Sequence, residues 1–351
     1  MRFLITGING FAGNWLARYL LLNNTEAEIY GTIKLHSNLE NLSDILNFIT
    51  LKTIDIRDSH SVLRLINDVR PDYVFHLAAI TYVPASWNAP IETFDTNVNG
   101  TINLLEAIRN LEGIVCYDPR ILIAGSSEEY GLVNGDETIA NPEIPIKETN
   151  QLRPMSPYGV SKVAQDRLGW QYFKSYGTRC IITRAFNHEG PRRPRDFVIS
   201  SFCYQIAAQE LMPEQDEIEI KCGSLDAFRD FSDVRDVVEA YAKILEAGEP
   251  GEVYNICSGH ARRISDIIAL LSPMAKKPLT IKQDPDRMRP SDVPILLGDN
   301  SKLKSTIDWK PRFTIEETIQ DCLNYWRSHI RRELGVYGES ANYEPIFKME
   351  E

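Results

Sequence analysis

Short apolar runs alternate with longer segments of helical periodicity over the first two-thirds of the chain. The runs have the length and composition of buried strands, which we predict at Arg2–Thr6, Glu28–Ile33, Tyr73–His76, Arg120–Ala124 and Cys180–Arg184. The segments between them predict helices at Phe11–Leu22, Ser59–Val69, Thr96–Leu111 and Tyr158–Tyr176. Strands that alternate with helices form βαβ units, so we predict an α/β fold around a doubly wound parallel sheet. Such sheets bind ligands at the carboxyl ends of their strands.

The last third of the chain has a more mixed pattern. Residues 221–230 (KCGSLDAFRD) are expected to form a loop, followed by a helix over Phe231–Ala247 and a strand over Val253–Cys257. An amphipathic helix is expected around Ile315–His329. These elements predict a second, smaller α/β domain toward the C-terminus.

Composition and charge exclude several classes of protein. The chain has 351 residues, of which 43% are hydrophobic, enough for a full core. Its formal net charge of −11 argues against nucleic acid as a partner, because phosphate binding requires a basic surface. No apolar run is long enough to span a membrane. The six cysteines form no CxxC pair and the six histidines show no metal-ligand spacing, so we expect reduced thiols, a cytoplasmic location and no metal.

A glycine motif lies between the first strand and the first helix. In TGINGFAG, Gly7, Gly10 and Gly13 have the spacing GxxGxxG. Glycines let the backbone approach a pyrophosphate, and the free N–H groups of the helix N-terminus stabilise its charge. A glycine-rich turn without a ligand is the alternative, but the position in a βαβ unit favours a dinucleotide site.

The end of the second strand bears on the type of dinucleotide. NAD sites carry an acidic residue there for the ribose 2′-hydroxyl. Here YGTIKLHSN has none, and Lys34 stands where a 2′-phosphate would lie, which favours NADP, with NAD as the alternative. Asp55, after the presumed third strand, is a candidate partner of the adenine amino group or a cap of the following helix.

Three residues form a candidate proton-transfer set. Tyr158 and Lys162 have a YxxxK spacing, which places them on one face of a helix. We expect the lysine to lower the pKa of the tyrosine so that the phenol exchanges protons, and also to reach the nicotinamide ribose. Ser126 ends the strand before this helix, where its hydroxyl could bond a substrate oxygen beside Tyr158. An ordinary surface tyrosine and lysine would be the alternative.

Together these motifs resemble the extended short-chain dehydrogenase/reductase family, which acts on nucleotide-sugars. The resemblance covers nearly the whole chain and includes HLAA (76–79), FNHEGPRR (186–193) and GSLDAFRDF (223–231). The last two resemble the branch of GDP-mannose 4,6-dehydratases and GDP-4-keto-6-deoxymannose reductases. The resemblance implies a Rossmann-type NADP-binding domain over residues 1–187 plus about 229–257. A discontinuous domain for the nucleotide-sugar would take residues of about 188–228 and 258–335.

The stretch SSEEYG (126–131) resembles the strand end of the dehydratases. There a carboxylate follows the serine or threonine by two positions, which here makes Glu128 the expected catalytic base for the C5 hydrogen of the hexose. The position of Glu129 is not usually catalytic in the family, and alternate residues of an extended segment face opposite ways. Glu129 is therefore expected to be structural.

A GDP-sugar needs fixed positive charge, and arginine binds phosphate bidentately. By resemblance, Arg229 and Arg289 are the expected pyrophosphate ligands, with Arg193 and Arg287 as further candidates, whereas Arg192 is expected to form a salt bridge. Other residues expected around the substrate are Tyr82, Ser127 and Asn187.

Two rival functions and the assembly stay open. A reductase of the same fold would use NADPH to reduce the 4-ketone, with Tyr158 as proton donor. A non-catalytic NADP sensor would not need the Ser126, Tyr158 and Lys162 set. Family resemblance implies a homodimer or homotetramer that pairs through the helices at Thr96–Leu111 and Tyr158–Tyr176. A loop over residues 35–48 could build the tetramer.

Overall fold

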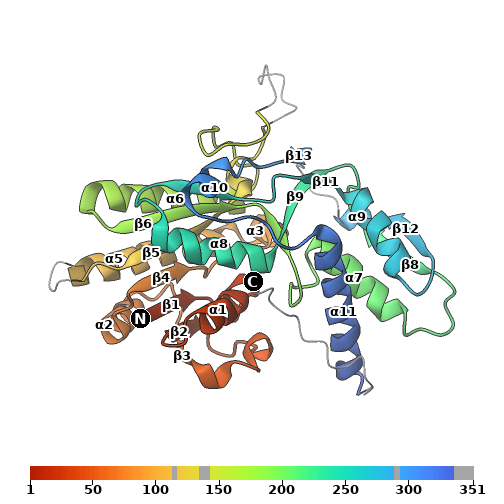
Figure 1. The fold of residues 1–351 in the computed structure, drawn as a ribbon, viewed down its shortest axis with the longest axis horizontal. Coiled ribbons are helices and arrows are strands. Elements are labelled where there is room, and N and C mark those ends of the chain that lie inside the picture. The colour runs from red at the N-terminus through yellow and green to blue at the C-terminus, as the bar shows by residue number, and fades with distance from the viewer. Residues whose placement is uncertain (113–116, 134–142, 288–292, 336–351) are drawn as a thin grey trace.

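The computed structural model describes residues 1–112, 117–133, 143–287 and 293–335, in two parts that lie side by side (Figure 1). The larger part is a seven-stranded sheet of order β10-β6-β5-β4-β1-β2-β3, in which every neighbouring pair is parallel. Its strands are β1 (Arg2–Thr6), β2 (Glu28–Ile33), β3 (Ile49–Thr53), β4 (Tyr73–His76), β5 (Arg120–Ser126), β6 (Arg179–Ala185) and β10 (Val253–Ile256). The predicted doubly wound, Rossmann-type sheet is confirmed.

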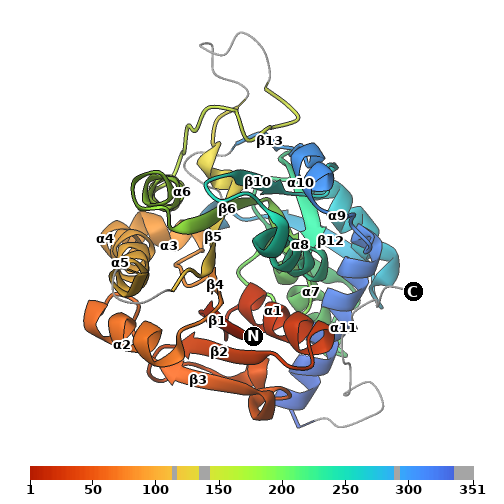
Figure 2. The same cartoon turned by 60° about the vertical axis from the view of Figure 1, so that its left-hand side comes forward.

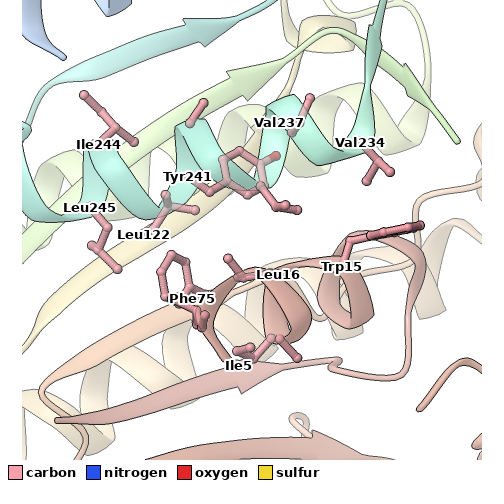
Figure 3. Close-up of a cluster of buried hydrophobic side chains, with 14 of the residues drawn as sticks. Ile5, Trp15, Leu16, Phe75, Leu122, Val234, Val237, Tyr241, Ile244 and Leu245 are labelled. Carbon is pink, nitrogen blue, oxygen red and sulfur yellow. The ribbon is translucent and has the colours of Figure 1, made fainter. Parts of the chain in front are cut away.

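Helices cover both faces of this sheet (Figure 2). One face carries α1 (Phe11–Asn23) and α8 (Val234–Ala247), and the other carries α2 (Ser59–Val69), α5 (Gly100–Glu112) and α6 (Pro157–Tyr176). Under α1 and α8, the side chains of Trp15, Leu16, Phe75 and Tyr241 meet in a buried cluster (Figure 3). Burial of each large apolar side chain contributes about 1.5–3 kcal/mol, so this packing fixes the helix N-termini against the strand ends.

The smaller part has a separate buried apolar cluster. It consists of α7 (Val198–Gln209), α9 (Ile264–Leu271), α11 (Ile315–Glu333) and the parallel pair β8 (Ile218–Cys222) and β12 (Leu279–Gln283). A four-stranded sheet, in which β9 pairs with each of the other three strands, is formed by β7 (Asn187–Glu189), β9 (Phe228–Asp233), β11 (Ala261–Arg263) and β13 (Ile295–Leu296). We keep the two-domain boundaries given above as a proposal.

The remaining elements are short. They are α3 (Val83–Asn88), α4 (Pro90–Phe94), α10 (Ser301–Thr306), a π-helical turn over Asp95–Asn99, and 3-10 turns over Glu40–Leu42, Leu46–Phe48, Ser127–Glu129, Ser272–Met274 and Pro285–Arg287.

Two predicted elements need correction. The helix expected over Phe231–Ala247 starts at Val234, because residues 228–233 pair as strand β9 and the Asp233 carboxylate caps the helix by accepting the N–H of Arg235. The loop expected over residues 221–230 is shorter than predicted, since its two ends belong to β8 and β9.

Candidate active site

The glycine motif forms a close-packed cradle at the start of α1. Gly7 has a positive φ of 71°, and a Cβ added at Gly13 would lie 2.5 Å from the Gly7 carbonyl oxygen and 2.8 Å from the Ile8 Cα. Only glycine fits there without a shift of the backbone. No side chain caps α1 at Gly10, and the first residues of the helix, Phe11 and Ala12, line a cavity. The cradle therefore fits a dinucleotide pyrophosphate.

A cavity of about 380 Å³ begins at this cradle and runs along the carboxyl ends of the strands. Most of the predicted site residues line it: Gly7, Gly10, Gly13, Lys34, Tyr82, Ser126, Ser127, Glu128, Tyr158, Lys162, Asn187 and Arg193. We call the side formed by Gly7, Gly10, Gly13 and Lys34 the cradle wall. The side formed by Tyr82, Asn187, Arg193 and Phe197 is called the arginine wall.

Among the described residues, the predicted site residues Asp55 and Arg229 do not line this cavity. The Asp55 carboxylate pairs with Arg57, whose guanidinium lowers the pKa of Asp55 to about 2, although the neighbouring Ile54 and Ile56 do line the cavity. The alternative role of Asp55 as a helix cap is wrong, because Asp58 caps α2. Arg229 is buried, donates to the carbonyl oxygens of Phe228 and Val293, and lines a much smaller cavity. Arg289 lies outside the described residues.

Arg287 is an additional candidate that the structure places elsewhere. Its guanidinium pairs with Asp284 at 3.3 Å and donates to the Ser201 hydroxyl at 3.1 Å, outside both cavities.

The proton-transfer set meets at the end of β5. The Ser126 hydroxyl is hydrogen-bonded to Tyr158, and the Lys162 Nζ lies 5.9 Å from the centre of the Tyr158 ring. Lys162 donates to the Ala124 carbonyl oxygen at 2.7 Å. All three side chains are buried, and they reach the same cavity from β5 and the first two turns of α6. The predicted combination is thus assembled in space.

Burial sets the pKa values of this set. It raises the pKa of Tyr158, with a smaller opposing effect of the Ser126 hydrogen bond, and it lowers the pKa of Lys162 to about 8. The sequence predicted that Lys162 lowers the pKa of Tyr158, whereas burial raises that pKa. The negative charge of Glu128 also raises the pKa of Tyr158, which indicates that the carboxylate lies near the phenol.

The two neighbouring glutamates have different environments. Glu128 is half-buried and lines both the large cavity and the small one that Arg229 contacts. Glu129 is fully buried, points away from the cavity lining, and bonds the Ser126 N–H and the Arg184 guanidinium. The expected contrast between a carboxylate at the cavity and a structural carboxylate agrees with this geometry.

Aromatic rings hold Arg193 in the arginine wall. Its guanidinium carbon lies 3.6 Å from the centre of the Phe197 ring and 4.7 Å from that of the Phe11 ring. The His188 ring stacks on the Phe11 ring. Within the described part of the chain the Arg193 Nε has no hydrogen-bond partner. Arg193 is thus held in place with bonding capacity to spare for an anion. Arg192 instead pairs with Asp44 and the Asn41 carbonyl, which confirms its predicted salt bridge.

Several residues of the site were not predicted. Phe11, Phe197 and Tyr241 line the cavity. Phe11 and Tyr241 follow ordinary helical apolar spacing, and Phe197 stands directly before α7, so no sequence pattern marks them as site residues. Buried His76 bridges the Thr6 and Thr101 hydroxyls at 2.9 Å each, which links β1 to α5. The HLAA motif was the available signal for this bridge.

The described residues contain neither a metal-binding cluster nor a membrane-spanning helix. No cluster of three or more metal-ligating side chains is found among them, and none of their helices has the length and hydropathy needed to cross a membrane.

The geometry can be compared with known proteins. The family model for GDP-mannose 4,6 dehydratase matches residues 4–322. The chain belongs to this family. A GDP-6-deoxy-D-mannose reductase from Pseudomonas aeruginosa is 34% identical over 95% of this chain and 99% of its own. A GDP-mannose 4,6-dehydratase from Vibrio cholerae is 32% identical over 91% of this chain and 92% of its own.

A solved structure agrees with this assignment. The structure of RMD from Pseudomonas aeruginosa complexed with NADPH matches with a TM-score of 0.76 and 33% identity, covering 93% of this chain and 99% of that one. The predicted resemblance to extended short-chain dehydrogenases/reductases is confirmed, and a nicotinamide cofactor is confirmed at the level of the family.

Proposed function

We propose that this member of the family is an NADP-dependent sugar-nucleotide 4,6-dehydratase that converts GDP-mannose to its 4-keto-6-deoxy product. The observation that carries the proposal is Glu128, a carboxylate that lines the same cavity as Ser126, Tyr158 and Lys162. A dehydratase needs a base at the hexose in addition to the tyrosine that handles the 4-hydroxyl proton. This site offers both.

Each residue has a distinct part in the reaction. NADP held by the cradle wall would supply the hydride acceptor for C4 and the hydride donor for C6. Tyr158 takes the proton of the 4-hydroxyl, while the Ser126 hydroxyl, hydrogen-bonded to the phenol, holds the same oxygen. The Lys162 ammonium favours the ionised phenol and orients the nicotinamide ribose. Glu128 removes the C5 proton, which the adjacent ketone makes acidic, and passes a proton to the C6 hydroxyl, which leaves as water. C5 later regains a proton from solvent.

The cofactor preference follows from the cradle wall. Exposed Lys34 follows β2 and lines the cavity, so it can pair with a 2′-phosphate, and no acidic residue stands at that strand end. This supports NADP over NAD. Asp55 would contact the adenine only by releasing Arg57, so we give it a lesser role than the neighbouring Ile54 and Ile56, which line the cavity.

The arginine wall supports a diphosphate substrate. Arg193, Asn187 and Tyr82 line the cavity, with Ser127 beside Glu128. Arg229 remains a candidate at the small cavity next to Glu128, and Arg289 remains one by resemblance. We extend the proposal to a cytoplasmic homodimer or homotetramer.

The test is mass spectrometry of GDP-mannose incubated with the purified protein and a catalytic amount of NADP, without added NADPH. Loss of one water from the sugar nucleotide is expected. An unchanged substrate would overturn the proposal.

One observation favours a second function. The 34% identical relative from Pseudomonas aeruginosa is named a GDP-6-deoxy-D-mannose reductase. A reductase would use Tyr158 as proton donor to the 4-ketone and would oxidise NADPH stoichiometrically. It would not require Glu128, so NADPH oxidation by a Glu128→Gln variant with the 4-keto-6-deoxy sugar separates the two functions.

A further inference from the structure

A buried cluster of charges lies directly behind the candidate active site. It contains Glu129, Asp166 and Arg184, whose side chains are at most 1% exposed. The Arg184 Nε donates to Glu129 Oε2 at 3.2 Å and to Asp166 Oδ2 at 3.0 Å, and its Nη2 donates to Asp166 at 2.8 Å. Buried charges destabilise a fold unless they are paired, and here two carboxylates share one guanidinium.

Glu129 joins this cluster to the catalytic serine. Its Oε1 accepts the Ser126 N–H at 2.7 Å, and the Ser126 hydroxyl accepts the Glu128 N–H at 3.2 Å, which closes a capping box around the turn at residues 127–129. Burial and the neighbouring Asp166 raise the pKa of Glu129 to about 8. The hydrogen bonds oppose this shift, because both carboxylate oxygens accept N–H bonds, one from Ser126 and one from Arg184, as an ionised carboxylate does. The backbone of Ser126 is fixed by this side chain.

The same carboxylate lies close to Lys162. A Cβ added at Gly125 would overlap Glu129 Oε1 and would lie 2.5 Å from the Thr183 carbonyl oxygen, so the carboxylate packs directly on the Gly125 backbone. The preceding residue, Ala124, accepts the hydrogen bond of the Lys162 ammonium at 2.7 Å.

Other groups also face Lys162. They are His76 on β4 and Tyr158 on the same helix, and neither provides a negative charge in its ordinary state. Asp166, on the same helix, pairs with Arg184 instead.

We propose that Glu129 is a positioning residue of the proton-transfer set: it fixes Ser126 through its N–H and supplies the buried negative charge that balances the Lys162 ammonium. The inference about Glu129 rests on the proposed function in one respect: catalysis requires a protonated Lys162. Burial lowers the pKa of Lys162 to about 8, and the charge of Glu129 opposes this effect. An ionised Glu129 thus favours the ammonium form of Lys162 over the neutral amine.

The first experiment measures the pKa of Lys162 in the cofactor-free protein. The protein carries 13C at lysine Cε, and the NMR signal is assigned with Lys162→Met. In Glu129→Gln we expect this pKa to fall by about one unit or more, because the neighbouring negative charge is lost. A change of less than about 0.3 units, well below that expected effect, would overturn the proposal.

A matched control separates charge at Glu129 from damage to the cluster. Asp166→Asn removes a carboxylate from the same arginine, but Asp166 raises the pKa of Glu129, so its loss keeps Glu129 ionised. We expect the pKa of Lys162 in Asp166→Asn to stay at or above that of the wild type. An equal fall in both variants would contradict a specific role for Glu129.

Activity provides a second measurement. The protonated lysine is present below its pKa and is lost as pH rises through it, so the alkaline limb of kcat/KM should move to lower pH in Glu129→Gln by the same amount. If the wild type does not act on GDP-mannose, the proposed function fails while the NMR titration still decides on Glu129. If the variant does not fold, a neutron structure of the wild type decides: an ionised Glu129 with a three-hydrogen Lys162 supports the proposal, and a protonated Glu129 overturns it.

Discussion

The cradle wall of the cavity is made of backbone at its three glycines and carries one side chain, Lys34, whereas the arginine wall is made of side chains. At Gly7, Gly10 and Gly13 the chain approaches itself so closely that Cβ atoms would disturb it. In the arginine wall, Arg193 is instead held between the Phe11 and Phe197 rings. The first wall depends on the absence of side chains and the second on their stacking. Substitutions should therefore affect cofactor and substrate separately.

The largest expected effect is at Gly13. In Gly13→Ala the new Cβ would meet the Gly7 carbonyl oxygen and the Ile8 Cα, so the cradle must shift. We expect NADP affinity to fall more than about a hundredfold, or about 3 kcal/mol, as measured by calorimetric titration. Gly177→Ala, at the end of α6 with no atom near its Cβ, is the control. It should strain the fold by about 1 kcal/mol and leave NADP affinity unchanged. Equal losses of affinity in both variants would refute the role of the cradle.

The second effect concerns stability behind the arginine wall. Burial raises the pKa of Glu189 from 4.5 to about 7. Between these values the unfolded chain ionises while the folded one stays neutral, so stability should fall by about 3 kcal/mol as pH rises through this window and level off above it. The Glu189→Gln variant should lack this loss of stability. Urea unfolding of the wild type and the variant at several pH values measures the difference.

Burial also raises the pKa of Asp236 to about 7. This group makes the wild type and Glu189→Gln lose the same stability over the same pH range, so the difference in stability between the two proteins is the quantity to compare. Glu26→Gln, at an exposed position, is the control and should follow the wild type at each pH. Parallel curves for Glu189→Gln and the wild type would contradict a raised pKa.

The third effect tests the stacking of Arg193. Arg193→Lys keeps the charge but loses the planar guanidinium between two rings. We expect the KM for GDP-mannose to rise roughly thirtyfold, about 2 kcal/mol, with kcat little changed. Arg192→Lys, whose parent side chain pairs with Asp44, should change KM less than about twofold because Arg192 does not line the cavity and a lysine can keep this ion pair. A fall in kcat alone would place Arg193 outside substrate binding.

The smallest effect is at Lys34. Lys34→Ala should weaken NADP binding about tenfold, or about 1.4 kcal/mol, and leave NAD binding unchanged, because only NADP carries the 2′-phosphate. Lys52→Ala, on β3 and outside the cavity lining, is the control for general charge. Equal loss of both cofactors would contradict the predicted preference for NADP.

The sequence was most informative where the physics is local. Buried parallel strands are continuous apolar runs, so Arg2–Thr6, Glu28–Ile33 and Tyr73–His76 were predicted with the bounds they have. The strand at residues 228–233 was missed because its apolar residues merge with those of α8, and only its pairing with β7, β11 and β13 distinguishes it.

The residues of the candidate site also differ in how far the sequence predicts them. Gly7 to Gly13, and Tyr158 with Lys162, have spacings that reveal their chemistry. The bonds of Arg184 to Glu129 and Asp166 join residues 55 and 18 positions apart, and the stack of Arg193 on Phe11 joins the proposed nucleotide-sugar domain to the Rossmann domain. No local pattern pairs them, so only the folded chain shows these contacts.

The central claim is that Glu128 is the base of a dehydration. The most direct test incubates GDP-mannose and catalytic NADP in D2O with wild-type protein or Glu128→Gln and measures the product mass. The account predicts that the wild type removes one water and introduces one solvent deuterium at C5, while the variant does neither and still binds NADP. A variant that dehydrates GDP-mannose at the wild-type rate would contradict it.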